Sequence, residues 1–224
     1  MITGIMKPIK IQGVFKKNDK IYTENPPSCK GIKVYNERLI NYQDKEFRSW
    51  NPYRSKLAAA ILKGLTFNIK PDSKVLYLGA ATGTTVSHIS DIVKSGIIYA
   101  VESSPIAANE LIKLCKIRSN IIPILEDAYH TERYSYFFNL VDLIYQDISQ
   151  RNQADIFIEN IKKYLKEDGI AIIMVKARSI DVSLKPKKAY ELIENRLREE
   201  KLRILHSIDL SPYEKDHAVI LVSN

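Results

Sequence analysis

The stretch Lys74-Val-Leu-Tyr-Leu78-Gly79-Ala-Ala-Thr-Gly83-Thr-Thr85 decides the fold class of this 224-residue chain. Lys74 to Leu78 is typical of a strand, and a helix is expected from Thr84 onward, so both glycines fall in the turn between them. Glycine lets the backbone turn tightly and approach a ligand closely. The free N–H groups at the start of the helix favour an anion, either a pyrophosphate or an amino-acid carboxylate.

Two acidic residues follow the next two expected strands. Glu102 stands where a carboxylate accepts both hydroxyls of an adenosine ribose. Asp127 is placed to accept a hydrogen bond from an adenine amino group. NAD and S-adenosylmethionine both fit this layout, although the spacing Gly79-x-x-x-Gly83 departs from GxGxxG and disfavours a dinucleotide.

Strands and helices alternate after residue 51, which predicts an α/β fold with a mostly parallel sheet and helices on both faces. We therefore expect one domain over residues 51–224. The expected strands are 74–78, 97–101, 121–125, 141–145, 169–175, 202–210 and 218–222, and the expected helices are 55–63, 84–94, 105–117, 154–165 and 187–201.

Residues 1–50 differ in pattern and predict a small antiparallel β-domain. Residues 9–15 alternate between apolar and polar, as in a half-buried strand, and a turn over 17–20 leads to a second strand at 21–23. Residues 31–35 and 39–42 are expected to pair around Asn36-Glu37.

The composition restricts the class of protein. A hydrophobic content of 45% and a charged content of 27% are those of a globular protein. The longest apolar run, 170–175, is too short to cross a bilayer, and the first eight residues lack the features of a signal peptide, so we expect a cytoplasmic protein. The two cysteines and four histidines are scattered, which excludes a structural zinc site.

The net charge of +8 favours an anionic partner, either nucleic acid or a membrane surface. Basic residues gather around the expected helix 187–201, where glutamates are interleaved with them. Contact with RNA phosphates and a solvated helix face both fit this pattern.

Several segments resemble fibrillarin, the methyltransferase family of box C/D guide-RNA complexes. The sequence Tyr77-Leu-Gly-Ala-Ala-Thr-Gly-Thr-Thr resembles the family's cofactor loop, and Trp50-Asn-Pro-Tyr-Arg-Ser-Lys-Leu-Ala58 resembles the start of its catalytic domain. Residues 99–102, 120–128 and 212–219 also match. Thr82, Ser103 and residues 146–150 depart from the residues usual in the family. The resemblance implies a Rossmann-like, S-adenosylmethionine-dependent methyltransferase domain over 51–224, preceded by the small β-domain of the archaeal forms.

The resemblance also implies two sets of site residues. We hypothesise that Lys176 is the general base, which requires a lysine pKa well below the usual value of about 10.4, and that Asp147 orients the lysines. The implied catalytic residues are Lys56, Asp147, Lys176 and His217. The implied cofactor-binding residues are Gly79, Ala80, Ala81, Gly83, Thr84, Thr85, Glu102, Ser103, Asp127, Ala128, Asp147 and Gln150. No metal is implied.

The function implied by the resemblance is methylation of ribose 2′-hydroxyls in pre-rRNA, with tRNA as a further target. The implied partners are a Nop-domain scaffold protein, a kink-turn-binding protein, a box C/D guide RNA and the target RNA, with no membrane. Only 8 glycines are present, so the Gly/Arg-rich nucleolar tail is missing and the archaeal, cytoplasmic type is expected. Three alternatives remain: a protein methyltransferase, an inactive structural subunit and a nicotinamide dehydrogenase.

Overall fold

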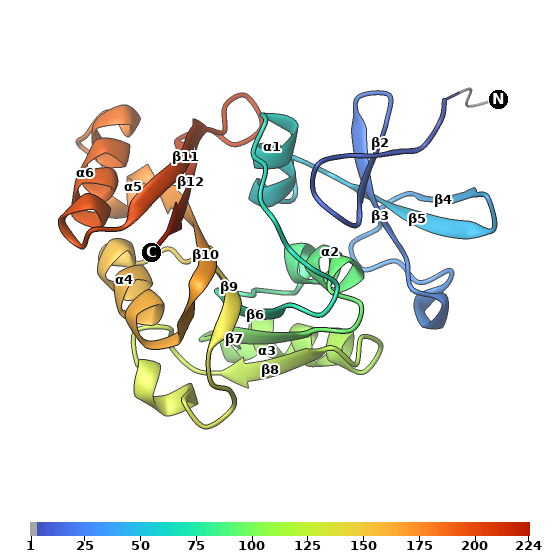
Figure 1. Ribbon diagram of the computed structural model, residues 1–224, viewed down its shortest axis with the longest axis horizontal. Coiled ribbons are helices and arrows are strands. Elements are labelled where there is room, and N and C mark those ends of the chain that lie inside the picture. Colours follow the sequence, from blue (N-terminus) through green and yellow to red (C-terminus); the bar gives the residue numbers. More distant parts are fainter. Residues whose placement is uncertain (1–3) are drawn as a thin grey trace.

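The computed structural model describes residues 4–224. Residues 1–3 lie outside the described residues, although the expected N-terminal domain and the stretch without signal-peptide features both include them. Two sheets organise the chain (Figure 1). No helix among the described residues is long and apolar enough to cross a membrane.

The larger sheet has seven strands in the order β11-β12-β10-β9-β6-β7-β8. The pairs from β10 to β8 are parallel, and β12 and β11 are added antiparallel at one edge. This confirms the predicted α/β class. The strands are β6 (Lys74–Leu78), β7 (Ile97–Glu102), β8 (Ile121–Leu125), β9 (Val141–Gln146), β10 (Leu165–Lys176), β11 (Arg203–Asp209) and β12 (His217–Ser223).

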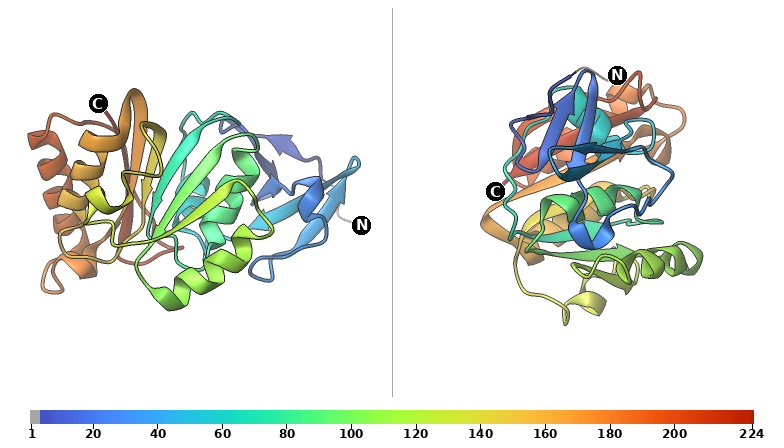
Figure 2. Two further views of the ribbon diagram at one scale, coloured as in Figure 1. Left: turned by 90° about the horizontal axis from the view of Figure 1, so that it is seen from below. Right: turned by 90° about the vertical axis from the view of Figure 1, so that its right-hand side faces the viewer.

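Helices cover both faces of this sheet because side chains alternate along each strand. Val75 and Tyr77 of β6 pack with α1, α2 and α3, whereas Leu76 and Leu78 pack with α4 and α6. Figure 2 shows these two helical layers on either side of the sheet. The helices are α1 (Lys56–Leu62), α2 (Thr84–Ile92), α3 (Pro105–Cys115), α4 (Gln153–Tyr164), α5 (Ala177–Ile180) and α6 (Pro186–Glu199), with short 3₁₀ turns at Pro27–Cys29 and Thr131–Tyr134.

The smaller sheet is antiparallel and has the order β1-β2-β3-β5-β4. The expected pairing of 31–35 with 39–42 is wrong, since β4 pairs with β5 instead. The expected strand 9–15 is wrong over residues 9–13, which form a turn between β1 and β2, and only its last two residues belong to β2. The strands are β1 (Lys7–Pro8), β2 (Val14–Lys17), β3 (Lys20–Glu24), β4 (Leu39–Tyr42) and β5 (Lys45–Trp50).

The two sheets share one hydrophobic core. Ile21 and Trp50 of the small sheet belong to the same buried cluster as Ile89 and Ile92 of α2. The indole ring of Trp50 stacks on the His88 imidazole, with 4.7 Å between ring centroids. The described residues therefore pack continuously across the boundary that we predicted at residue 50.

A buried group of charges reinforces this junction. Arg48 of β5, whose side chain is fully buried, donates to Glu37 Oε1 at 2.7 Å and to Asp91 Oδ2 of α2 at 2.8 Å. Thr23 Oγ1 donates to the same Asp91 oxygen at 2.6 Å, and Arg118 Nη1 donates to the other Asp91 oxygen. Buried charges require such pairing because an unpaired one is costly to desolvate. Helix α2, which begins at the glycine loop, is thereby held to the small sheet.

Candidate functional site

The cofactor loop, residues 79–84, connects β6 to α2 and passes very close to the backbone of Asp147. Gly79 has a φ of +83°, and a Cβ at this position would lie 2.6 Å from the carbonyl oxygen of Asp147. The Asp147 N–H also donates to the Leu78 carbonyl at 2.9 Å. Only glycine satisfies both the left-handed φ and the close approach. The loop and the end of β9 therefore lie in direct contact.

A pocket of about 380 Å³ opens beside this loop, at the carboxyl ends of the parallel strands. We call it the cofactor pocket. Ligands in open α/β sheets bind at this edge. Eight of the predicted cofactor-binding residues line it, namely Gly79, Ala81, Glu102, Ser103, Asp127, Ala128, Asp147 and Gln150.

Glu102 and Asp127 hold fixed positions in the wall of the cofactor pocket. The Glu102 carboxylate accepts hydrogen bonds from the N–H groups of Ala81 at 2.7 Å and Ser104 at 2.8 Å. Asp127 Oδ1 accepts from Gln150 Nε2 at 2.9 Å and from the Tyr129 N–H at 2.9 Å. Each Glu102 oxygen keeps a second lone pair, and Asp127 Oδ2 accepts no hydrogen bond within residues 4–224, so both side chains can still accept from a ligand. A pocket of this size with two fixed carboxylates fits the adenosine part of S-adenosylmethionine.

Three of the predicted catalytic residues meet at the rim of this pocket. Lys56 Nζ donates to Asp147 Oδ2 at 3.2 Å, and Lys176 Nζ lies 3.1 Å from Asp147 Oδ1. Lys176 Nζ also donates to Ser149 Oγ at 2.8 Å. The ammonium groups come from α1 and from the end of β10, and each lies at a different oxygen of the carboxylate. Asp147 thus fixes both lysines beside the cofactor pocket.

His217 lies next to this trio but is held separately. It is the cross-strand partner of Lys176 in the β10–β12 pair. Its Nδ1 is 2.7 Å from the Lys215 carbonyl oxygen and 3.9 Å from Glu214 Oε2. Within residues 4–224 the imidazole makes no hydrogen bond to Lys56, Asp147 or Lys176. The structure therefore places His217 at the site through the sheet register.

Two buried tyrosines lie near Asp147. The rings of Tyr77 and Tyr145 pack with 4.5 Å between centroids. Burial, together with the Asp147 charge, raises the pKa of Tyr77 well above its ordinary value, and burial, the Tyr77 hydroxyl and the Asp147 charge do the same for Tyr145. Both phenols therefore stay protonated near neutral pH, and neither serves as a base.

Four predicted cofactor-binding residues do not line the cofactor pocket. Ala80 is buried, and Gly83 packs against Leu114 of α3. Thr85 Oγ1 lies 2.9 Å from Ser55 Oγ, the side chain that caps α1. Thr84 faces a different cavity. These residues shape the loop and the start of α1, and their predicted contacts with the cofactor stay predictions.

Sequence reasoning missed Ser149 and Gln153. Ser149 lines the pocket and accepts the hydrogen bond from Lys176. Gln153 Oε1 accepts from the Lys176 N–H at 3.1 Å, and Gln153 Nε2 donates to the Gln150 carbonyl at 3.3 Å. Its side chain thus ties the end of β10 to the loop after β9. Its full burial at the start of α4 is visible only in the structure, so the sequence alone did not distinguish it from an exposed polar residue.

Comparisons with known proteins agree with this geometry. The sequence model of the Fibrillarin family matches residues 5–224. A fibrillarin-like rRNA/tRNA 2′-O-methyltransferase from Methanothermobacter thermautotrophicus is 47% identical, with 97% of each chain covered. A structure of Aeropyrum pernix fibrillarin with natively bound S-adenosyl-L-methionine aligns with a TM-score of 0.87 at 38% identity, covering 99% of this chain and 100% of that one.

The chain is also similar to fibrillarin in a structure of a fibrillarin/Nop5p complex. The TM-score is 0.88 at 42% identity, covering 96% of this chain and 98% of the other. The match extends over both sheets, so the small sheet and the methyltransferase sheet are shared features. On this similarity of sequence and structure, the chain belongs to the fibrillarin family.

Proposed function

We propose that this protein is an S-adenosylmethionine-dependent methyltransferase that acts on ribose 2′-hydroxyls of RNA. The observation that carries the proposal is the Lys56–Asp147–Lys176 arrangement at the rim of the cofactor pocket. The relative from Methanothermobacter thermautotrophicus bears the same activity in its name, and the Aeropyrum pernix fibrillarin holds the cofactor. A nicotinamide dehydrogenase is not supported by these relatives.

The residues of the pocket would hold the cofactor through their polar groups. Glu102 would accept hydrogen bonds from the ribose hydroxyls of the cofactor, and Asp127 with Gln150 would bind the edge of the adenine. When bound, S-adenosylmethionine supplies a methyl group activated by a sulfonium. While both lysines are protonated, the edge of the pocket carries two ammonium groups and one carboxylate, a net positive charge that suits the approach of an anionic RNA strand.

The lysines are the groups placed to handle the proton of the ribose hydroxyl. We propose that Lys176, in its neutral amine form, accepts this proton as the ribose oxygen is methylated, and becomes an ammonium group paired with Asp147. Its Nζ lies at the pocket wall beside Ser149 and Asp147. Lys56, held by the other Asp147 oxygen, positions the ribose. His217 is proposed to support the network from the neighbouring strand. Fixed positions of this kind supply much of the rate in a transfer between two bound groups.

We propose that the protein works within a particle. A Nop-domain scaffold is supported by the complex of a related fibrillarin with Nop5p. A kink-turn-binding protein, a guide RNA that selects the target by base pairing, and an rRNA or tRNA target complete the proposal. A location in the cytoplasm stays a prediction.

The test is transfer of radiolabelled methyl groups to a target RNA, by the protein alone and in a mixture with scaffold, kink-turn protein and matched guide. Label at one guide-specified ribose, only in the complete mixture, is expected. Lys176→Ala should lower the rate by about 10² to 10⁴-fold at saturating cofactor. Lys166→Ala is the matched control, because Lys166 also lies on β10 and pairs with an aspartate, Asp142, away from the pocket.

A Lys176→Ala rate near that of Lys166→Ala would contradict the role of Lys176 as the base. Asp147→Ala should abolish detectable transfer. If the unmodified protein binds S-adenosylmethionine but labels no RNA in the complete mixture, a structural subunit becomes the better interpretation. Label transferred to a peptide without guide RNA would instead indicate a protein methyltransferase.

A further inference from the structure

A second cavity, which we call the basic cavity, lies on the other side of the cofactor loop. Its volume is about 370 Å³. Thr82 and Thr84 of the loop line it, whereas Gly79 and Ala81 line the cofactor pocket. Arg54, in the segment that leads into α1, forms another part of its wall. The cofactor loop is therefore a partition between the two cavities.

The lining of the basic cavity carries an excess of positive charge. Four basic side chains, Lys33, Arg54, Lys113 and Arg118, face one acidic side chain, Glu110. Lys113 Nζ lies 2.6 Å from Glu110 Oε1, so these two neutralise each other. Lys33 and Arg54 are exposed and form no ion pair with any residue of the described part of the chain. Two cations are thus available to an anion in solution.

The inner wall adds a buried donor that lacks a partner. The Arg118 side chain is 2% exposed, and its Nη atoms are used by Asp91 and Asn25. Its buried Nε has no hydrogen-bond partner among residues 4–224. A buried donor that is left unpaired costs about 1–3 kcal/mol, and more if the group is charged. A ligand acceptor that bonded to this Nε would therefore stabilise the complex.

Helix α2 begins at the same cavity. Its N-cap is Gly83, which has no side chain to cap the first N–H groups, and no acidic residue lies in the first turn. The free N–H groups and the helix dipole favour an anion here. The Thr82 and Thr84 hydroxyls supply further donors at the cavity wall.

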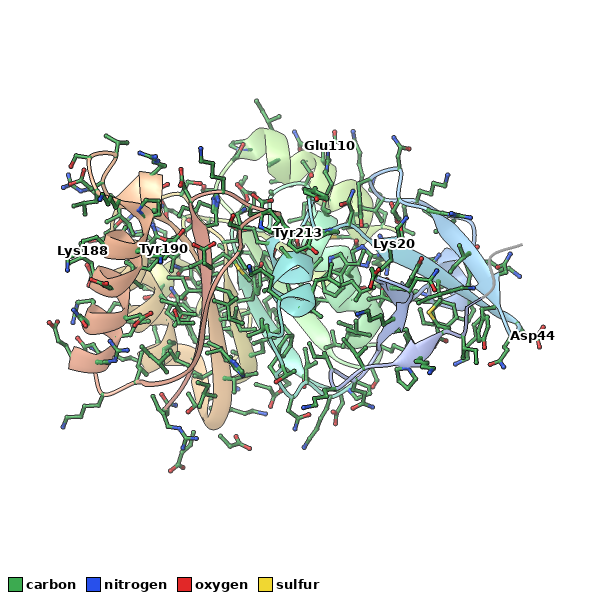
Figure 3. The ribbon with its side chains drawn as sticks, turned by 90° about the horizontal axis from the view of Figure 1, so that it is seen from above. Lys20, Asp44, Glu110, Lys188, Tyr190 and Tyr213 are labelled. Atoms are coloured by element: carbon green, nitrogen blue, oxygen red, sulfur yellow. The ribbon has the colours of Figure 1, made fainter. Side chains whose placement is uncertain are left out.

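The basic residues of α6 differ in this respect. Arg196 pairs with Asp155 and Glu200, and Arg198 pairs with Glu194. Lys188 pairs with Glu191, and Figure 3 shows it far from Glu110 at the basic cavity. Contact of this helix with RNA phosphates was one interpretation of the sequence, but its cations are largely matched by acids. Lys33 and Arg54 beside the cofactor loop, in contrast, have no acidic partner within residues 4–224 and line a cavity.

We propose that the basic cavity binds a backbone phosphate of the substrate RNA, close to the nucleotide that is methylated. This inference rests on the proposed function. Arg54 and Lys33 contact the phosphate oxygens, and Thr82 donates a hydrogen bond. Contacts to phosphate fix the position of a strand without reading its sequence. Because Arg54 lies two residues before Lys56, the bound phosphate sets how the ribose meets the predicted catalytic lysines.

The test compares Arg54→Gln and Lys33→Gln, which remove charge from exposed positions, with Arg196→Gln on α6 as the control. Arg118 is left unchanged because its loss would strand Asp91. The affinity for a labelled single-stranded RNA is measured over roughly 50 to 400 mM salt. Each cavity variant should bind about tenfold more weakly at low salt. The negative slope of log affinity against log salt concentration should become shallower by about 0.7 for each phosphate contact that is lost.

Two further measurements separate the sources of the anion. The affinity for S-adenosylmethionine should be the same in all variants; a tenfold loss in Arg54→Gln would assign the cavity to the cofactor's carboxylate and overturn the proposal. Inorganic phosphate at constant ionic strength should not raise the melting temperature. A rise that Arg54→Gln abolishes, with RNA affinity unchanged, would indicate a site for free phosphate instead.

Methyl transfer in the complete mixture distinguishes this inference from the proposed function. If the unmodified protein methylates RNA and both cavity variants keep its RNA affinity within twofold and its salt slope, the phosphate site is wrong and the proposed function stands. If the unmodified protein neither binds RNA nor transfers label, the proposed function itself fails.

Discussion

Gly79→Ala is expected to impair methyl transfer without unfolding the protein. A Cβ at this position would lie 2.6 Å from the Asp147 carbonyl oxygen, and ordinary contact begins at 3.4 Å, so the loop and Asp147 must separate by about 0.8 Å. Asp147 holds both Lys56 and Lys176, so the displacement reaches the predicted base. A misplacement of about 1 Å costs about 10²-fold in rate. We expect a loss of that order at saturating cofactor.

Gly64→Ala supplies the matched control. Gly64 also has a left-handed φ, of +101°, but a Cβ added there would have no atom within 4 Å. Both variants carry the backbone strain of alanine at positive φ, about 1–2 kcal/mol, and only Gly79→Ala adds the collision. Single-turnover methyl transfer in the complete mixture is the assay, with thermal unfolding to check stability. Equal rates for the two variants, within threefold, would refute the argument from close approach.

Two further predictions concern the junction of the sheets. Arg48→Met strands the Glu37 and Asp91 carboxylates and should lower the free energy of unfolding by about 3–5 kcal/mol at pH 7 in urea titrations. Burial favours a raised pKa for Glu37, but Arg48, together with the N–H groups of Tyr35 and Val34, outweighs burial and holds the pKa below 4.5. The stabilisation by Arg48 is therefore lost as the pH falls through the folded pKa of Glu37, and the Arg48→Met deficit should shrink. A constant deficit would contradict the pairing. Burial, with Arg48 and Arg118, lowers the pKa of His88 well below 6.5, so the unfolded chain binds the extra proton. Stability should therefore fall by about 1 kcal/mol between roughly pH 6.5 and 5.5; a His88 proton titrating near 6.5 by NMR would contradict this.

The large sheet was predictable from sequence because its central strands are buried on both faces. Val75 to Leu78 and Ile170 to Val175 form almost continuous apolar runs. Gly79 follows the first run and Gly169 precedes the second. The carboxyl-edge positions of Glu102, Asp127 and Asp147 follow directly from that pattern. Lys56 was assigned through the family resemblance alone, since nothing local distinguishes it from an ordinary helical lysine.

The small sheet was harder because local hydrogen bonds override its pattern. The Glu37 carboxylate accepts from the N–H groups of Val34 and Tyr35, which a strand over 31–35 would need for pairing. Gly13, at a φ of +79°, lies in the turn that replaces the expected strand over residues 9–13. The Arg48–Asp91 pair joins residues 43 positions apart, so no periodicity reveals it.

The sharing of Asp91 among Thr23, Arg48 and Arg118 has a consequence for building hybrids of family members. A crossover at residue 50, where the pattern changes, would cut between the donors of β3 and β5 and their acceptor on α2. The smallest exchangeable unit is therefore discontinuous, made of residues 4–50 together with α2 and Arg118. Hybrids that exchange this whole set should fold. Hybrids that exchange the small sheet alone combine Asp91 with donors from another protein, and the buried charge group on α2, next to the cofactor loop, is then no longer matched.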